Sequence, residues 1–335
     1  MARRAGLSKS LVSRVLRGEP AVSPTAREAV LAAAVELGYR PNAVARSLVQ
    51  RRTFNVGVLV SDLHNLFFAE VLDGLDSAAS ARGYRMLITT GNRDPEAEAR
   101  ALEQLVELRA DAVVLAGARL AAERVTAILG AVPAAVVGCD LALAGLDVVV
   151  TDDVRGAELA VEHLAGLGHR LIAMIDGDGG AGAAERQAGY ESAMTRLGLT
   201  AEVRVVPGDF TEQGGREGVL RLLAGGRQPG VPPRAMPTAV LAANDLAAIG
   251  ALAALAEAGL DVPGDISLVG YDNTSLAALR PIALTTVHQP RREIGELAMT
   301  ALLQRLEKPG TLPCHRLLAP ELVVRATTGP PPPSH

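Results

Sequence analysis

From Phe54 onward, short runs of apolar and β-branched residues alternate with amphipathic helical stretches. The runs predict strands at 56–60, 85–89, 112–115, 125–129, 135–137, 171–175, 202–206, 239–242 and 266–269. The intervening stretches predict helices at 67–82, 95–108, 157–167, 185–197, 212–223 and 246–258. This alternation indicates parallel sheets covered by helices on both faces.

The alternation restarts near residue 171, so residues 54–329 are expected to form two α/β halves in tandem, each of about 100 residues. Such a pair predicts two hinged lobes with a cleft between them. Because parallel sheets bind ligands beyond the carboxyl ends of their strands, we expect this cleft to be the ligand site. The proline-rich residues 330–335 are low in complexity and are predicted to be disordered.

The first fifty residues predict a separate all-α head. Ser8 is placed to cap a helix at 9–17, and Ser23, followed by Pro24, is placed to start a second helix that ends at Gly38. Apolar stripes on the two helices are expected to face each other. The stripe residues are Val12, Val15 and Leu16 on the first helix and Val30, Ala33, Ala34 and Leu37 on the second.

Polar residues occupy the other side of the helix at 9–17, and a third short helix is expected at 41–50. A helix with a polar exposed first turn and an apolar packed face suits insertion into a DNA groove. Arg14 can pair with a guanine edge, whereas Lys9 and Ser13 can reach phosphates or bases. A structural helix pair could share this pattern, but the added segment at 41–48 disfavours that interpretation.

Charge is distributed unevenly along the chain. Residues 1–52 hold ten Lys and Arg against three Glu, a net charge of +7, so the remainder must carry −11 for the whole chain to total −4. A basic head on an acidic body indicates that only the head meets a polyanion.

Several classes of protein are disfavoured by the sequence. Cys139 and Cys314 lie far apart, and the six histidines have no metal-ligand spacing, so no disulfide framework, metal site or cofactor is predicted. No nucleophile elbow of the form G-x-S-x-G occurs, and we expect no enzymatic activity. No apolar run is long enough for a membrane span, and no secretion signal is evident, which favours a cytoplasmic protein.

One glycine-rich segment resembles a dinucleotide-binding fingerprint. Residues 177–182 fit G-x-G-x-x-G after a predicted strand and before a predicted helix, with Glu202 twenty residues further on. A loop of this kind can hold a pyrophosphate at a helix N-terminus, which leaves an NAD-dependent enzyme as a minor alternative. The segment opens the second half of the body rather than the first, which disfavours it.

A set of motifs runs in order along the chain: RAGLSKSLVSRVL (4–16), VSPT (22–25), LGYRPN (37–42), ARSL (45–48), GVLVS (57–61), NLFF (65–68), EHLAGLGHR (162–170), AND (243–245), DISLVGYD (265–272) and LTTV (284–287). Together they closely resemble the lac repressor (LacI/GalR) family of bacterial transcription regulators. The resemblance implies a helix-turn-helix head at 1–40, a hinge helix and linker at 41–53, and an effector-binding and dimerisation body at 54–329. That body is of the two-lobed, periplasmic-binding-protein-like type.

The resemblance also implies residue roles. Lys9, Ser10 and Arg14 match the family's base-reading turn, and Ser13 matches a phosphate contact. Leu48 matches a leucine that wedges into the minor groove and kinks the DNA. Flanking backbone contacts are implied for Asn42 and Arg46.

Six residues match the family's effector contacts in the cleft: Ser61, Phe68, Asp140, Arg186, Asn244 and Asp272. Their carboxylates, guanidinium, amide and aromatic face suit a sugar or polyol. The alternative for Asp140 and Asp272 is a turn or cap role, which is common for Asp. Phe67 and Tyr190 are expected to belong to the core.

These implications predict a repressor that binds a pseudo-palindromic operator in double-stranded DNA as a homodimer and is controlled by a sugar-like effector. The family has several further residues before Ala2, so we also expect the native chain to begin earlier than Met1. The alternative is a two-lobed small-molecule binding protein, of the periplasmic sugar-binding type, that lacks DNA-binding activity because its head is truncated.

Overall fold

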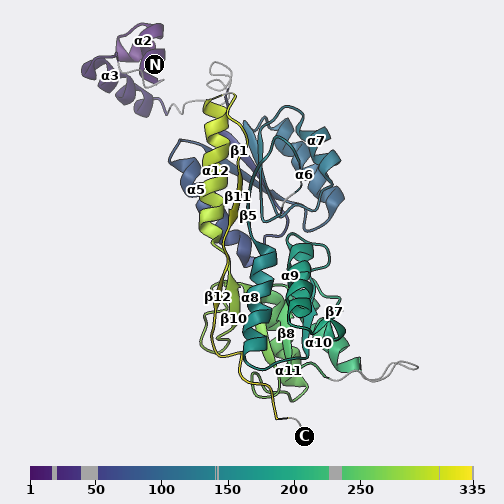
Figure 1. Cartoon of the computed structure of the whole chain (residues 1–335). Coiled ribbons are helices and arrows are strands. Elements are labelled where there is room, and N and C mark those ends of the chain that lie inside the picture. The colour runs from purple at the N-terminus through teal and green to yellow at the C-terminus, as the bar shows by residue number, and fades with distance from the viewer. Residues whose placement is uncertain are drawn as a thin grey trace. The chain divides into compact units, whose positions relative to one another are not determined.

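The computed structural model of the chain describes residues 1–16, 21–38, 52–139, 141, 143–225, 236–308 and 310–333. These residues form two compact units, residues 1–54 and residues 55–335. We refer to the first unit as the head and to the second as the body (Figure 1). The predicted hinge helix falls at 41–50, which lies outside the described residues.

Three helices make up the described part of the head: α1 (Ala2–Ala5), α2 (Lys9–Leu16) and α3 (Pro24–Glu36). Both predicted caps are confirmed. The Ser8 hydroxyl accepts a hydrogen bond from the Leu11 backbone N–H at 3.2 Å, and the Ser23 hydroxyl accepts one from that of Ala26 at 3.3 Å. These bonds satisfy N–H groups that the first turn of each helix would otherwise leave without a partner.

A small apolar core holds the head helices together. Its buried members are Val12, Val15, Val22, Ala26 and Val30. The prediction for Leu37 was wrong, because its side chain is 53% exposed. Leu37 is the C-cap of α3, one residue beyond its last helical residue Glu36 and directly before Gly38, whose φ of 58° ends the helical path.

The first lobe of the body contains a six-stranded parallel sheet in the order β11-β5-β4-β3-β1-β2. Its strands are β1 (Asn55–Val60), β2 (Arg85–Thr90), β3 (Ala112–Ala116), β4 (Ala134–Val137), β5 (Asp147–Thr151) and β11 (His315–Leu318). Its helices are α5 (Leu66–Ser80), α6 (Pro95–Glu107), α7 (Ala122–Leu129) and α12 (Arg291–Glu307). Figure 1 shows α5 and α12 on one face of this sheet and α6 and α7 on the other.

The second lobe repeats this plan in the order β12-β10-β9-β8-β6-β7, with β12 antiparallel at the edge. Its strands are β6 (Ile172–Ile175), β7 (Arg204–Val206), β8 (Ala239–Ala242), β9 (Ser267–Asp272), β10 (Thr285–His288) and β12 (Glu321–Val323). Its helices are α8 (Asp153–Gly166), α9 (Ala183–Arg196), α10 (Glu212–Ala224) and α11 (Asp245–Glu257), with a short 3-10 helix η1 (Thr200–Glu202).

Alternation along the strands builds two cores on each sheet. On β6, Ala173 and Ile175 pack with α10 and α11, whereas Ile172 and Met174 pack with α8 and α9. Successive side chains of a strand point to opposite faces, so a strand buried on both faces must be apolar throughout. This accounts for the continuous apolar runs in the sequence and confirms the parallel α/β architecture.

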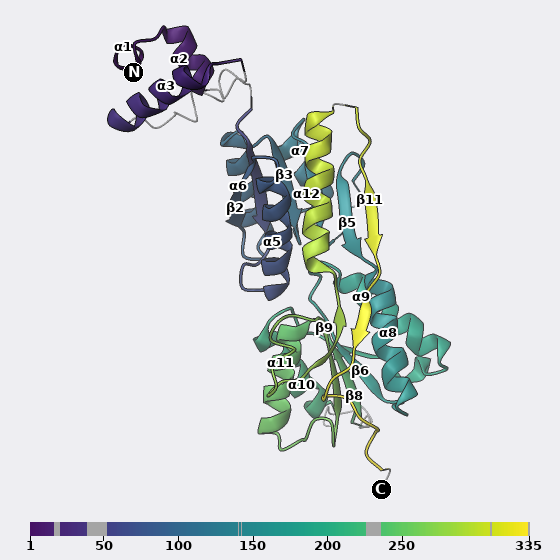
Figure 2. The same ribbon diagram turned by 90° about the vertical axis from the view of Figure 1, so that its left-hand side faces the viewer.

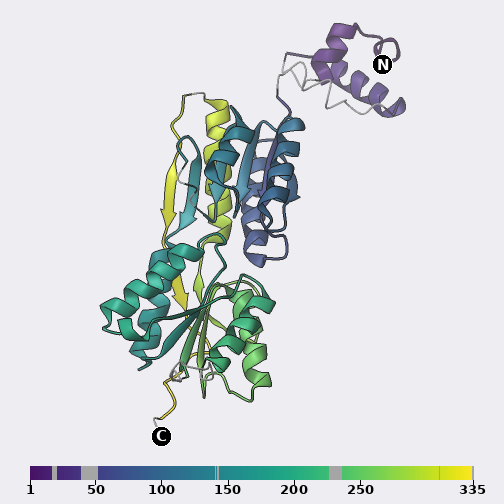
Figure 3. The same cartoon turned by 90° about the vertical axis from the view of Figure 1, so that its right-hand side faces the viewer.

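The two lobes are not consecutive halves, which corrects the tandem prediction. After β10 the chain returns to the first lobe as α12, which packs on α5, and β11 then leads back into β12 of the second lobe (Figures 2 and 3). Helix α12 stays in the first lobe because one of its faces is apolar and buried there. The residues of that face are Ile294, Ala298, Met299, Leu302 and Leu303.

The strand predicted at 125–129 was also wrong, because these residues belong to helix α7. Val125 and Leu129 are buried, whereas Thr126 and Ala127 are exposed, which is the burial pattern of a helix rather than of a strand. At the C-terminus, residues 330–333 are neither helix nor strand, and Pro331 and Pro332 are half-buried.

Candidate functional site

The outer face of α2 carries polar side chains, as predicted. Lys9, Ser10 and Ser13 are exposed. Arg14 is half-buried, and its Nη2 donates a hydrogen bond to the backbone carbonyl of Ala21 at 3.2 Å. The Arg14 guanidinium therefore also braces the segment that leads into α3. The other predicted DNA contacts, Asn42, Arg46 and Leu48, lie outside the described residues.

An ion pair joins the first and third helices of the head. The Arg4 Nε donates to a carboxylate oxygen of Glu36 at 2.6 Å, and both side chains are exposed. Met1, Ala2 and Ala5 pack against the apolar core, so the short α1 contributes to it. Exposed pairs of this kind add about 0–1 kcal/mol, so packing rather than charge holds α1 in place.

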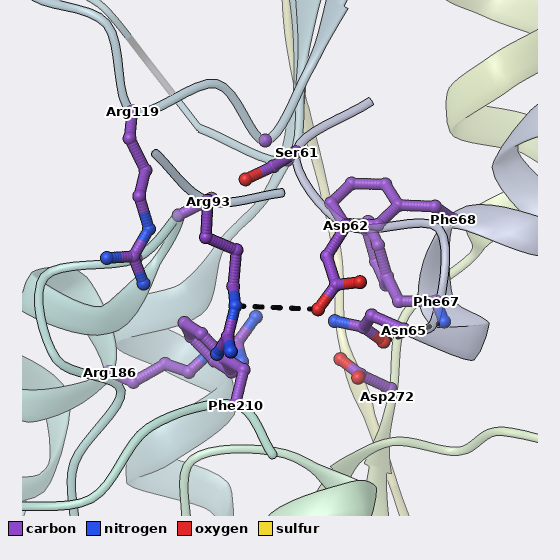
Figure 4. Close-up of a pocket in the computed structure, with 14 residues that line it drawn as sticks. Ser61, Asp62, Asn65, Phe67, Phe68, Arg93, Arg119, Arg186, Phe210 and Asp272 are labelled. Carbon is purple, nitrogen blue, oxygen red and sulfur yellow. Dashed lines mark hydrogen bonds and ion pairs between the residues drawn. The ribbon is translucent and has the colours of Figure 1, made fainter. Parts of the chain in front are cut away.

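The body contains a pocket between its two lobes, enclosing about 470 Å³ that is partly continuous with solvent. Its lining residues come from the carboxyl ends of strands of both sheets, from the loops that follow those strands and from the first turns of the next helices, as expected for parallel sheets. The lining consists of Ser61, Asp62, Asn65, Phe67, Phe68, Arg93, Gly117, Arg119, Gly138, Gly180, Ala181, Arg186, Phe210 and Asp272 (Figure 4).

Two aromatic rings form one wall of this pocket. Phe67 and Phe68 meet edge to face, with centroids 5.1 Å apart and an interplanar angle of 86°. Gly117 allows this packing, because a Cβ there would lie 2.4 Å from the Phe68 ring. Phe67 is buried as expected, yet its ring also borders the pocket, so assigning it to the core alone was incomplete.

Arg186 is held rigidly at the base of the pocket. Its Nε donates to Asp153 Oδ1 at 3.0 Å, its Nη1 donates to the Ala243 carbonyl at 2.6 Å, and its Cζ lies 3.9 Å from the ring centroid of Tyr271. Burial alone would lower the pKa of Arg186, but the nearby acidic groups, Asp153 first and then Tyr271 and Asp272, together outweigh burial and the pKa is raised. Among the described residues no hydrogen bond uses Nη2, which leaves that group for a ligand.

Asp272 lies at the end of β9 and is only 2% exposed. Its Oδ1 accepts a hydrogen bond from the Gln289 amide at 2.7 Å, and its φ of 107° is a backbone conformation that residues other than glycine rarely adopt. Burial raises the pKa of Asp272 to about 7, with Arg186 acting in the opposite direction and Asp245 reinforcing the rise. Its carboxyl group can therefore accept or donate a hydrogen bond near neutral pH.

The structure brings four of the six predicted effector contacts together at the pocket: Ser61, Phe68, Arg186 and Asp272. Asn244 is absent from the lining. It caps α11, where its Oδ1 accepts from the Ala247 backbone N–H at 2.9 Å, and its Nδ2 donates to the Phe210 carbonyl at 3.2 Å. It therefore supports the Phe210 loop. Asp140 lies outside the described residues.

Sequence reasoning missed several lining residues, chiefly Arg93, Arg119 and Phe210. Each follows a strand of a parallel sheet, on the loops after β2, β3 and β7, and this position was the available signal. Arg93 joins the lobes, since its Nη1 lies 3.2 Å from Asp209 Oδ2 while its Nε lies 3.6 Å from Asp62 Oδ2.

The glycine-rich segment has a steric role at the pocket. A Cβ at Gly177 or Gly180 would lie within 2.6 Å of the Phe210 ring, and a Cβ at Gly182 would lie 2.5 Å from Asp153 Oδ2. These glycines let the pocket side chains approach the loop. This steric requirement explains the G-x-G-x-x-G pattern, so a bound dinucleotide is not needed to explain it.

Comparisons with known proteins follow the same division into head and body. Residues 1–42 match the family described as bacterial regulatory proteins, lacI family, and residues 161–328 match the periplasmic binding protein-like domain. The chain is 35% identical over 332 residues to the ribose operon repressor of Escherichia coli K12, covering 98% of each. It is 32% identical over 312 residues to catabolite control protein A of Priestia megaterium, covering 92% of each.

Solved structures agree with this assignment. The lac repressor dimer bound to operator and the anti-inducer ONPF is 31% identical, with a TM-score of 0.83 and coverage of 98% of this chain and 97% of that one. A LacI-family regulator from Enterococcus faecium with bound ribose is 28% identical, with a TM-score of 0.73 and coverage of 82% and 99%. This chain belongs to the LacI family and is a DNA-binding transcriptional regulator.

Two further findings concern the described residues alone. No helix among them is both long and apolar enough to cross a membrane. Within the same ranges, no group of three or more His, Cys, Asp or Glu side chains could hold a metal ion. The curated relatives compared above are regulators.

Proposed function

We propose that this regulator represses transcription as a homodimer on a pseudo-palindromic operator and is controlled by a small hydroxylated molecule bound between its lobes. One observation carries the proposal: the same chain combines two features. Its head has an exposed polar helix face, and its body has a pocket lined by Phe68, Arg186 and Asp272. A homodimer is supported by the likeness to the lac repressor dimer, and a two-fold operator would match its symmetry.

We assign base contacts to Lys9, Ser10 and Arg14 and a phosphate contact to Ser13. The exposure of Lys9, Ser10 and Ser13 supports their assignment, and that of Arg14 rests on the family resemblance. The net charge of +7 over residues 1–52 favours binding to the DNA backbone. Leu48 is proposed as the hinge residue that wedges into the minor groove, and Asn42 and Arg46 are proposed as flanking contacts to the DNA backbone. The corresponding domain limits are 1–40 for the head, 41–53 for the hinge and 54–329 for the body, and the proposed compartment is the cytoplasm.

The pocket chemistry supports a sugar-like effector. An ionised Asp272 accepts hydrogen bonds from hydroxyl groups, Arg186 Nη2 donates one, and the ring of Phe68 offers an apolar face for ring C–H groups. Proteins similar to this chain bind ribose or cellobiose in their structures. Ser61 supplies a further hydroxyl, and Asp140 is assigned to the same site.

Control of DNA binding follows from the position of the pocket. Ser61 and Phe68 belong to the first lobe, whereas Arg186 and Asp272 belong to the second. A ligand that contacts both lobes stabilises one relative arrangement of them, and it can change operator affinity only by its difference in affinity between the arrangements.

Operator selection tests the proposal directly. The purified full-length chain is incubated with a random DNA library, and bound sequences are recovered and measured by fluorescence anisotropy at several salt concentrations. We expect an inverted repeat, a steep salt dependence, and a shift in operator affinity with a sugar-like ligand. Ligand binding without any specific DNA binding would instead favour a two-lobed binding protein without regulatory activity.

A further inference from the structure

Three arginines line the pocket, and all lie on the same side of it in the view of Figure 4: Arg93, Arg119 and Arg186. In this view the three arginines lie with Phe210 on one side of the pocket, and Phe67, Phe68, Asn65 and Asp272 lie on the other, so the cationic groups are gathered on one side.

Two of the three arginines have carboxylate partners at close range. Arg186 pairs with the buried Asp153 at 3.0 Å. Arg93 lies between Asp209 at 3.2 Å and Asp62 at 3.6 Å. These charges are compensated by the protein, so neither guanidinium needs an anion from a ligand.

Arg119 differs from the other two. The nearest carboxylate to its guanidinium among the described residues is Asp178, at 4.0 Å, and that side chain is 73% exposed. A pair at this distance with an exposed partner is weak and screened by solvent. The Arg119 side chain itself is only 19% exposed. The guanidinium is thus partly withdrawn from water. Among the described residues its charge meets this weak pair and, at longer range, the buried Glu98, whose pKa is raised by burial, and no carboxylate lies closer than 4.0 Å.

The surroundings of Arg119 hold it in the pocket. Its backbone N–H donates to Oε2 of the buried Glu98 at 2.7 Å, which fixes the start of the side chain. A Cβ at Gly180 would lie 3.1 Å from Arg119 Nη2, so the missing side chain leaves the guanidinium room beside this loop. The loop leads into the N-terminus of α9, whose positive end adds to the favourable field for an anion.

We propose that the effector is a polyhydroxylated molecule that carries an acidic group, a carboxylate or a phosphate, bound by Arg119 beside the start of α9. Its hydroxyl groups then face Asp272 on the other side of the pocket. This inference rests on the proposed function, because it assumes that the pocket is the effector site. It goes further by naming the charge of the ligand and the residue that selects it.

A neutral sugar is a poorer match for physical reasons. When a ligand displaces water from the pocket, Arg119 loses hydration, and a neutral hydroxyl restores only part of it. A carboxylate or phosphate forms charge-assisted and frequently bidentate hydrogen bonds with a guanidinium.

Matched ligand pairs test the inference. Binding to the purified full-length chain is measured by calorimetry for glucose against gluconate, glucuronate and glucose 6-phosphate, and for ribose against ribose 5-phosphate. We expect at least one acidic compound to bind ten times more tightly than its neutral parent, and added salt to reduce this advantage. The tightest acid identifies the carboxylate or the phosphate as the preferred group.

Variants assign the effect to Arg119. Arg119→Gln is expected to weaken binding of the preferred acid about tenfold or more while changing the affinity for its neutral parent less than threefold. Arg119→Lys retains the positive charge and should recover part of the loss. Arg124→Gln removes an exposed arginine of α7 in the same lobe and should leave all ligand affinities unchanged.

Equal or tighter binding of the neutral parents, no binding of any acid, or an unchanged acid affinity in Arg119→Gln would each overturn the inference. Failure of the proposed function has a different signature. A neutral sugar that shifts operator affinity would uphold the proposed function and refute the acidic effector. Tight, Arg119-dependent binding of an acid without any operator binding would uphold the acidic ligand and refute the proposed function.

Discussion

Arg186 Nε lies 3.0 Å from Asp153 Oδ1, and both side chains are buried beside the pocket. Asp153 is the first residue of α8 and Arg186 belongs to the first turn of α9, so the pair joins the starts of two neighbouring helices. Burial raises the pKa of Asp153 even beside Arg186. The arrangement fixes the guanidinium before a ligand arrives, so little side-chain entropy is lost on binding.

Asp153→Asn should therefore destabilise the body strongly. The substitution preserves the size of the side chain but leaves the buried Arg186 charge uncompensated, at a cost of about 3 kcal/mol in the free energy of unfolding. Urea denaturation followed by circular dichroism measures the change. Glu158→Gln is the control, because it disrupts an ion-pair network with the half-exposed Arg155 and Arg196 and should cost less than about 1 kcal/mol. Equal losses in both variants would contradict a special role for the buried pair.

Arg14→Ala should weaken specific operator binding by about 1–3 kcal/mol and leave binding to unrelated DNA largely intact. Because Arg14 also donates to the Ala21 carbonyl, the thermal stability of the head is measured in parallel. The affinities of Lys9→Ala for operator and for unrelated DNA are measured at the same salt concentrations and compared with those of Arg14→Ala. An equal loss on operator and unrelated DNA would show that Arg14 does not read bases.

Leu48→Ala should reduce the bend that the protein imposes on its operator. The expectation comes from family resemblance, because Leu48 lies outside the described residues. Unstacking a base step costs free energy, and the inserted apolar side chain offsets part of that cost. Without this side chain the step should stay stacked and the duplex should remain straighter. Bend angles from energy transfer between dyes at the ends of the operator provide the measurement. A wild-type bend angle in the variant would exclude the wedge role.

Local features of the fold were predictable from the sequence. Ser8 and Ser23 cap their helices as expected, since a cap depends only on the next three residues. The strand predicted at 56–60 was correct within one residue, because a strand buried on both faces must be apolar throughout. Alternating strands and helices of this kind predict a parallel sheet, and a parallel sheet predicts a ligand site at the carboxyl ends of its strands.

Features that depend on distant contacts were not predictable. The return of α12 and β11 to the first lobe is decided by packing against α5 and β5, which local patterns do not encode. Arg93 and Arg119 lie on loops without periodicity, so only the fold brings them to the pocket. Asn244 matches a family contact, yet here its side chain caps α11 and bonds to the Phe210 loop.

Gly180→Ala should weaken ligand binding about tenfold while leaving operator binding without ligand unchanged. The added methyl group would lie 2.4 Å from the Phe210 ring and 3.1 Å from Arg119 Nη2, so both side chains must move. Calorimetry with the preferred ligand measures the effect. Gly166→Ala is the matched control, because a Cβ there meets nothing within 4 Å. An unaltered affinity in Gly180→Ala would exclude these side chains from the ligand site.

The stability of the body should depend on the ionisation of Asp272. Burial raises its pKa from an ordinary value of 3.8 to about 7, so the folded state binds this proton more tightly than the unfolded state does. The resulting stabilisation is complete below about pH 4 and is lost as the pH rises through 7, by on the order of 1–4 kcal/mol.

Asp272→Asn cannot titrate at this position, so its free energy of unfolding should fall less than that of the wild type between pH 5 and about 8. Ligand affinity should change in the opposite direction in the wild type, because an ionised Asp272 accepts hydrogen bonds from hydroxyl groups more strongly than a protonated one. Urea denaturation and calorimetry across this range test both effects. Parallel pH profiles for the two proteins would show that Asp272 keeps an ordinary pKa in the folded body.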